Sequence, residues 1–317
     1  MILNKSFNKI SIVIPCLNEE QNLRLVTGPL GQQLEQYPQS SEIVLVDDGS
    51  SDGSWALIRQ LRHEDKRIRG IKLSRNFGKE AAVAAGLAHA EGDLVILMDS
   101  DLQHPPELIP KMIEIWRHND VEIVDAVKQS RGDEGSIKNI FSRLFYVLFS
   151  KMADLDLRNA SDYKLLSRKA LDAWSRLPER NLFFRGMSLW IGYPRAEIPF
   201  SVAPRTVGRS GWGYGKLTQL AISALTAYSS APLRLVALSG MLFSIFALIL
   251  GLHTLFNYFS GQAVSGFTTV ILLLLLVGAA ILFGLAVIGE YIGRIYEEIK
   301  QRPRYLVADT TDSDAST

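Results

Sequence analysis

The sequence has little cysteine and no excess of either charge. Its 317 residues include one cysteine, Cys16, which excludes an internal disulfide framework and favours a reducing compartment. The 34 basic and 33 acidic residues nearly cancel, to a formal net charge of +1. Nucleic-acid-binding proteins usually carry a basic excess, so we expect no nucleic-acid partner. The first apolar run, residues 10–14, is too short for the hydrophobic part of a secretory signal.

Charge is absent from one long region near the C-terminus. Residues 235–289 contain no Asp, Glu, Lys or Arg. The region holds two apolar runs, 235–258 and 267–289, and each is longer than the ~20 residues that a helix needs to cross a bilayer core. A buried hairpin of a soluble protein is the alternative, but charge-free runs of this length are rare in soluble cores. We therefore predict a transmembrane hairpin over residues 231–296.

Lysine and arginine are distributed unevenly around these two runs. The connecting residues 259–266 contain neither. Basic residues lie before the first run and after the second: Lys216, Arg234, Arg294, Lys300, Arg302 and Arg304. The positive-inside rule then predicts that both termini, the preceding domain and a tail over residues 297–317 are cytoplasmic. We expect an integral protein that crosses the bacterial inner membrane twice.

Small residues recur inside the apolar runs, at Gly240, Gly251, Gly278, Ala279, Ala280 and Gly284. Small side chains let membrane helices approach closely, so they predict a homo-oligomer, with a tetramer as one arrangement.

Residues 1 to about 130 alternate strand-like and helix-like segments. Apolar runs predict strands at 10–14, 42–46, 71–73, 94–98 and 122–127. Helical patterns occupy 19–36 (with a break near Gly28 and Pro29), 54–62, 79–90 and 106–117. This alternation predicts an α/β domain with a mostly parallel, Rossmann-like sheet that helices cover on both faces. We expect this domain to extend to residue 230.

Three further segments have a recognisable composition. Residues 136–151 form an amphipathic pattern. The pattern fits a helix on the membrane surface and a helix packed on the protein core equally well. Residues 216–228 form a second such pattern that leads into the first apolar run. Residues 309–317 are polar and acidic, and we expect them to be disordered.

Polar clusters follow four of the predicted strands, at residues 15–20, 47–53, 74–79 and 99–103. Such sheets bind ligands at the carboxyl ends of their strands. Asp99, Asp101 and Gln103 offer the oxygen ligands that Mg²⁺ or Mn²⁺ prefers, although a turn or capping pair is the alternative for the two carboxylates. A carboxylate at 47–48 can bind a ribose hydroxyl or a base, or can stabilise the turn.

Arg75 and Lys79 bring positive charge to the same sheet edge, where they can bind the phosphates of a nucleotide sugar. As isolated surface cations they would have no such role.

The motifs at the strand ends resemble those of a known family. Residues 12–20 (Ile-Val-Ile-Pro-Cys-Leu-Asn-Glu-Glu), 46–52 (Val-Asp-Asp-Gly-Ser-Ser-Asp) and 98–107 (Met-Asp-Ser-Asp-Leu-Gln-His-Pro-Pro-Glu) resemble the family-2 inverting glycosyltransferases. Residues 73–79, 161–163, 205–210, 232–234 and 289–296 are similar to the polyprenyl-phosphate branch, which includes dolichyl-phosphate mannose synthases and bactoprenol glucosyltransferases. The resemblance covers residues 9 to 305.

The resemblance implies a GT-A fold, a nucleotide-diphosphate sugar donor, a divalent metal and a lipid-phosphate acceptor at the membrane. It implies that the nucleoside is held by Pro15, Asn18, Glu20, Asp47 and Asp48. It assigns the metal and diphosphate to Asp99, Asp101 and Gln103. It places Arg205 and Ser210 on a phosphate-contacting loop and Asp162 at the reacting centre. Gly211 departs from the family pattern, which often has a basic residue there; Arg209 or Lys216 can supply that charge.

The expected reaction transfers a hexose to a phosphate monoester, which is largely ionised at neutral pH and hardly needs a general base. We therefore expect Asp162 to orient the acceptor, and the metal with Arg205 to stabilise the leaving diphosphate. Glucose from a UDP donor is the preferred prediction; N-acetylhexosamine, GDP-mannose and a modified pentose are alternatives. A processive polysaccharide synthase is disfavoured because the sequence has no Arg-Trp pair. A non-catalytic nucleotide-binding membrane protein is disfavoured by the intact Asp99 and Asp101.

Overall fold

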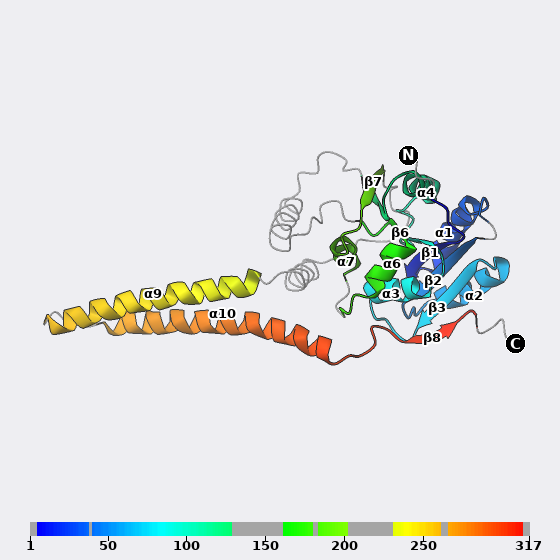
Figure 1. Cartoon of the computed structure of the whole chain (residues 1–317). Coiled ribbons are helices and arrows are strands. Elements are labelled where there is room, and N and C mark those ends of the chain that lie inside the picture. Colours follow the sequence, from blue (N-terminus) through cyan, green and yellow to red (C-terminus); the bar gives the residue numbers. More distant parts are fainter. Residues whose placement is uncertain are drawn as a thin grey trace. The chain divides into compact units, whose positions relative to one another are not determined.

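The computed structural model describes residues 5–37, 40–128, 161–179, 183–201, 231–260 and 266–312 (Figure 1). The chain divides into two compact units. The first, here called the sheet unit, comprises Met1–Ser150, Asp154–Trp212 and Arg302–Thr317. The second, here called the hairpin unit, comprises Lys151–Ala153 and Gly213–Gln301.

The sheet unit is built on an eight-stranded sheet of order β7-β5-β6-β4-β1-β2-β3-β8. Its centre is parallel, because β1 pairs in parallel with β2 and β4, and β2 pairs in parallel with β3. The flanks are antiparallel where β6 meets β4 and β5, and where β8 meets β3. The strands are β1 (Ile10–Cys16), β2 (Ser41–Asp47), β3 (Ile68–Leu73), β4 (Leu94–Leu97), β5 (Ile123–Lys128), β6 (Lys164–Ser167), β7 (Arg195–Phe200) and β8 (Val307–Thr310).

All the predicted strands are present, as β1 to β5. Every residue of β1, β2 and β4 is buried, which explains their continuous apolar character. The sheet is more mixed than the sequence predicts, since β6, β7 and β8 were not anticipated. β6 and β8 are four residues long and carry polar side chains, so they have no strand-like apolar run.

Helices connect the strands: α1 (Glu20–Gln33), α2 (Ser54–Glu64), α3 (Lys79–His89), α4 (Ile109–His118, after a short 3-10 turn at Pro106–Leu108), α6 (Arg168–Ser175) and α7 (Phe184–Trp190). The predicted break in the first helix is wrong, because α1 continues through Gly28 and Pro29. Its buried residues Leu23, Val26 and Leu30 pack into the core on both sides of the proline, and this packing outweighs the lost backbone hydrogen bond.

The expected disorder at 309–317 is wrong for residues 309–312. β8 pairs with β3, and Thr311 is only 2% exposed. The Gly70 amide donates to Thr311 Oγ1 at 2.8 Å, and the Thr311 amide donates to the Gly70 carbonyl at 3.0 Å. A polar segment is ordered here because the open edge of β3 offers unpaired backbone groups that no local sequence pattern reveals.

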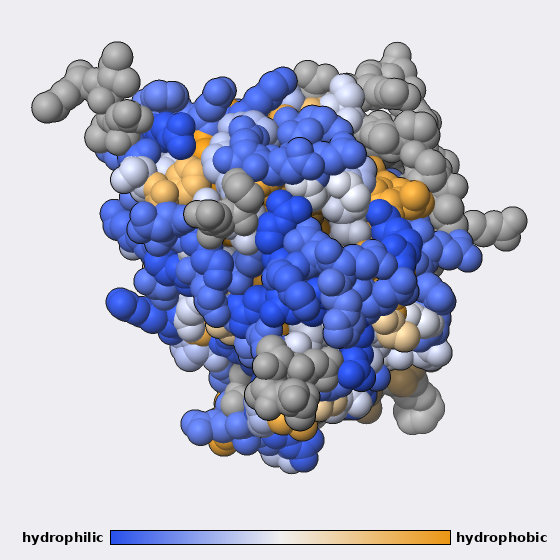
Figure 2. All heavy atoms as spheres, turned by 90° about the vertical axis from the view of Figure 1, so that its right-hand side faces the viewer, coloured by the Kyte–Doolittle hydropathy of each residue, from blue (hydrophilic) through white to orange (hydrophobic). Residues whose placement is uncertain are grey.

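The hairpin unit contains two long helices, α9 (Ala231–Phe259) and α10 (Phe267–Ile299). Both are long and apolar enough to cross a membrane, over Leu233–Asn257 and Leu273–Ile299, with mean hydropathies of 2.5 and 2.4. Large apolar side chains such as Leu248, Leu274 and Phe283 are exposed along them. The face of the molecule in Figure 2 is instead mainly hydrophilic, with scattered apolar residues. The amphipathic segments 136–151 and 216–228 lie outside the described residues.

Candidate functional site

The carboxyl ends of β1, β2, β3 and β4 meet at one edge of the sheet, because these four strands run in parallel. The loops that follow them are joined by side-chain contacts. The loop after β1 contacts the loop after β2, which contacts the loop after β3, and α3 contacts the loop after β4. The predicted convergence of these polar clusters is therefore present.

Asn18 and Glu20 connect the loops that follow β1 and β2. Asn18, with a positive φ of 55°, accepts a hydrogen bond at Oδ1 from the Ser51 amide (2.8 Å). Glu20 Oε2 accepts from the Gly53 amide (3.1 Å). Pro15 lies within β1, opposite Val46. These contacts shape the loops and leave any nucleoside contact of the three residues as a prediction.

Asp47 and Asp48 have different surroundings at the end of β2. Asp48 accepts the Phe77 amide at Oδ1 (2.8 Å) and the Gly78 amide at Oδ2 (2.9 Å), so it holds the loop after β3. Burial raises the pKa of Asp48 above its usual value, and these two amides oppose the shift. Asp47 is fully buried and accepts the Ser50 amide at Oδ1 (2.9 Å). Its Oδ2 has no hydrogen-bond partner among the described residues, which leaves an acceptor for a ligand.

The loop after β3 carries Arg75 and ends at Lys79, the first residue of α3. The Arg75 guanidinium lies 4.1 Å from the centre of the Phe77 ring. The Lys79 ammonium lies between two carboxylates, 2.6 Å from Asp99 Oδ1 and 2.9 Å from Asp162 Oδ2. Burial would lower the pKa of Lys79, but the two carboxylates raise it above its usual value. Lys79 is therefore a fixed cation at the strand ends.

Asp162 is held by a second cation, Arg185 of α7. Arg185 donates from Nε to Oδ1 and from a terminal nitrogen to Oδ2, both at 2.7 Å. Burial would raise the pKa of the Asp162 carboxyl, but hydrogen bonds from Arg185 and the charge of Lys79 hold it well below its usual range. Asp162 is consequently a permanent anion and a weak proton acceptor.

Sequence reasoning missed both Arg185 and its neighbour in space, Glu80. Glu80 Oε2 accepts a hydrogen bond from the Phe184 amide at 2.8 Å, and so fixes the start of α7 next to Arg185. Burial raises the pKa of Glu80 to about 7. Arg185 stands in a segment without a distinctive motif, and Glu80 directly follows the motif at residues 73–79. The fold brings both residues to Asp162.

The turn after β4 is shaped by its own backbone contacts. The Asp99 amide donates to His104 Nδ1 at 2.9 Å, and the His104 ring stacks on Tyr163 with centres 4.7 Å apart. Burial lowers the pKa of His104, which keeps Nδ1 available as an acceptor. Asp101 Oδ1 accepts from the Gln103 amide (3.1 Å). His104 is a further positioning residue that the sequence analysis did not single out.

The turn carries oxygen donors of the kind that hard divalent cations bind. Asp99 and Asp101 supply carboxylate oxygens, and Gln103 Oε1 already faces the Lys128 ammonium at 3.3 Å. The Asp99 carboxylate likewise faces the Lys79 ammonium, so positive charge is favoured at both positions. No group of three or more His, Cys, Asp or Glu residues within the described ranges is arranged to hold a metal. The predicted residues Arg205 and Ser210 lie outside these ranges.

A sheet of this topology, with polar clusters at the ends of its parallel strands and an Asp-x-Asp turn after β4, defines a GT-A-type fold. The chain belongs to glycosyl transferase family 2, whose family model matches residues 11–173. This confirms the resemblance found in the sequence, and the protein is a glycosyltransferase.

Relatives match nearly the whole chain. An uncharacterized glycosyltransferase of Synechocystis is 36% identical over 303 residues, which cover 95% of this chain and 95% of the relative. The SfII prophage-derived bactoprenol glucosyl transferase of Shigella flexneri is 36% identical over 301 residues, which cover 94% of this chain and 97% of the relative. The solved glucosyl-3-phosphoglycerate synthase of Mycobacterium tuberculosis shares the fold, with a TM-score of 0.50, 18% identity and coverage of 70% and 81% of the two chains.

Proposed function

We propose that this glycosyltransferase transfers a hexose from a nucleotide-diphosphate sugar to a polyprenyl phosphate at the cytoplasmic face of the membrane, with inversion at the anomeric carbon. The observation that carries the proposal is the cluster formed by Lys79, Arg185, Asp162 and Asp99 in a chain that also has two candidate membrane helices. The cations suit a reaction between two phosphate-bearing substrates, and the apolar helices suit a lipid acceptor.

Glucose from a UDP donor is the proposed substrate. Full-length relatives named bactoprenol glucosyl transferase support glucose and a polyprenyl acceptor. The buried Oδ2 of Asp47, which has no hydrogen-bond partner among the described residues, supports a donor nucleoside at the end of β2, since a ribose hydroxyl or a base N–H would satisfy this acceptor.

A divalent ion, Mg²⁺ or Mn²⁺, would be held by Asp99, Asp101 and Gln103. Its chemistry there would be to neutralise charge on the departing nucleoside diphosphate. Arg205, Ser210 and Arg75 are proposed to contact the phosphates, and Pro15, Asn18, Glu20 and Asp48 to shape the nucleoside pocket.

The chain's own residues supply orientation and charge. Asp162 fixes Lys79 and Arg185 through contacts of 2.7 to 2.9 Å, so both cations face the reacting region in a set geometry. The acceptor phosphate has a second pKa near 6 and is largely ionised at neutral pH, so it attacks without losing a proton to Asp162. Asp162 therefore acts as an orienting anion in this mechanism.

The two helices are proposed to span the bacterial inner membrane, with the catalytic part, residues 1–230, in the cytoplasm. The basic flanks of residues 231–296 support this orientation. Gly240 and the other small residues of the spans support a homo-oligomer.

One assay tests the proposal directly. The purified protein is given polyprenyl phosphate and a panel of labelled UDP-sugars and GDP-mannose, with and without EDTA. Labelled lipid is expected with UDP-glucose and is expected to disappear with EDTA. Labelled lipid from another sugar alone would replace the donor assignment. The acceptor assignment would fall if no donor gave labelled lipid.

A further inference from the structure

The chain segment that follows α10 lies along the open edge of the central sheet. β8 pairs antiparallel with β3, with Thr310 opposite Ile71 and Val307 opposite Leu73. The Arg304 guanidinium donates to the Leu177 carbonyl at 2.6 Å. We call residues 304–312 the strap.

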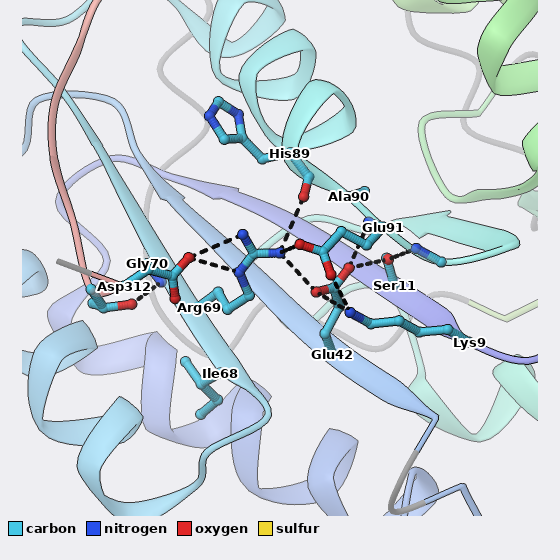
Figure 3. Close-up of polar contacts among 12 residues, drawn as sticks. Lys9, Ser11, Glu42, Ile68, Arg69, Gly70, His89, Ala90, Glu91 and Asp312 are labelled. Atoms are coloured by element: carbon cyan, nitrogen blue, oxygen red, sulfur yellow. Dashed lines mark hydrogen bonds and ion pairs between the residues drawn. The ribbon is translucent and has the colours of Figure 1, made fainter. Parts of the chain in front are cut away.

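The far end of the strap is anchored at the amino ends of the strands. Asp312 Oδ2 accepts from Arg69 Nε at 3.0 Å, and the same guanidinium contacts Glu42 at 3.0 Å and Glu91 at 2.9 Å (Figure 3). Lys9 contacts Glu42 and Glu91 from the other side. Glu42 is only 3% exposed, so the network has a buried centre and a fixed geometry.

The strap packs closely against β3 next to this anchor. Gly70 exchanges two hydrogen bonds with Thr311. A Cβ added at Gly70 would collide with Thr311 Cγ2 and Ile58 Cγ2, so the strap is seated closely on β3. The strap is therefore held at a defined register along β3.

The near end of the strap meets the candidate site. The Ser74 amide donates to the Leu306 carbonyl at 2.8 Å. Ser74 begins the loop after β3, whose Phe77 and Gly78 amides bind Asp48 and which ends at Lys79. One hydrogen bond thus connects the strap to the loop that presents Lys79 to Asp99 and Asp162.

We infer that the strap is a positioning element for donor binding, which holds residues 74–79 in the conformation that the nucleotide sugar requires. Strand addition at a sheet edge supplies the binding energy through backbone hydrogen bonds, with side-chain anchors at its end. The inference rests on the proposed function for the identity of the ligand, and on the contacts above for the ordering of the loop.

The test compares two truncated forms of the full membrane protein. One ends at Pro303 and lacks the strap. The matched control ends at Asp312 and lacks only residues 313–317. For both forms we measure hydrogen exchange at residues 74–79 and the affinity for UDP. The KM for the donor and kcat are also measured, to separate donor binding from turnover.

Loss of the strap is expected to speed exchange of the Ser74 amide and its neighbours. It is expected to weaken UDP binding about tenfold, the order that follows from losing one or two hydrogen bonds that hold a binding loop. The control should match the full chain. A peptide of residues 304–312 added to the shorter form should restore both properties.

Unchanged exchange at 74–79 and unchanged UDP affinity in the shorter form would overturn the inference. If the shorter form does not fold, the Thr311→Val variant replaces it. This substitution removes only the Oγ1 contact with Gly70, and the variant is judged by the same exchange and UDP-affinity measurements. Exchange and UDP binding are measured without acceptor. If the protein binds UDP through an ordered loop but makes no lipid product, the result contradicts the proposed function. The inference about the strap would then still hold.

Discussion

Asp162 is a carboxylate that two cations contact from different helices, Lys79 of α3 and Arg185 of α7. Its pKa is held below the usual range, so its ionised form stabilises the fold above the unfolded pKa of about 3.9. That contribution is lost only as the pH falls through the depressed folded pKa. Asp162 should therefore not titrate in the pH range where the enzyme works.

Replacement of Asp162 by asparagine tests the orienting role. Asp162→Asn removes the charge that balances Lys79 and Arg185, and kcat is expected to fall by roughly 100-fold, as when a preorganised electrostatic contact is lost. The wild-type profile of kcat/KM should show no acidic limb from this residue above about pH 5. Steady-state kinetics across pH measure both.

Arg185→Lys and Arg185→Gln test the other side of the same ion pair. The Arg185→Lys variant keeps the positive charge but loses the bidentate contact with Asp162. Its kcat should therefore fall less than that of Arg185→Gln. Wild-type turnover and donor KM in Asp162→Asn would remove this carboxylate from the mechanism.

Glu80 should make stability depend on pH. Burial raises the pKa of Glu80 in the folded protein from the usual 4.5 to about 7. The contribution of Glu80 to the free energy of unfolding is therefore complete below pH 4.5 and is lost as the pH rises through 7. The free energy of unfolding should decline over that window with a slope of up to about 1.4 kcal/mol per pH unit. Chemical denaturation at several pH values measures the slope. Glu80→Gln should flatten it, and an unaltered slope would contradict the assignment.

At the scale of elements, the turn after β4 is the proposed metal-binding element. Asp101→Ala should lower activity by at least about 100-fold, because it removes charge stabilisation of the leaving group. The exposed Glu114→Ala on α4 is the matched control and should remain active. Activity is measured over a titration of Mg²⁺ and Mn²⁺ after EDTA treatment. Full, EDTA-resistant activity of Asp101→Ala would reject the site.

The sequence predicted the elements whose cause is local. β1, β2 and β4 are mainly apolar and fully buried, and the polar clusters after the parallel strands meet because these strands end at one edge of the sheet. The contact between Lys79 and Asp162 spans 83 positions and depends on β6 lying beside β4, which no local pattern encodes. β8 is acidic and short, and it is a strand only because β3 leaves an edge for it.

At the scale of the whole molecule, the proposed topology can be tested by cysteine labelling. The native Cys16 is buried, at 3% exposed, so background labelling should be low. Ser260→Cys, after α9, should react with an impermeant thiol reagent in intact cells. Lys66→Cys, in the sheet unit, should react only after the membrane is opened. Labelling of both in intact cells would refute the cytoplasmic assignment.

The position of β8 in the chain also sets an order of synthesis. β3 is made early, but its partner strand follows α9 and α10. During translation the edge of β3 therefore stays open until both apolar helices have been made. Chains grow at about 5–20 residues per second, so this interval lasts for roughly ten seconds or more. The last strand of the sheet therefore forms only after both apolar segments have been made, and the loop at residues 74–79 gains the hydrogen bond from the Ser74 amide to the Leu306 carbonyl only then.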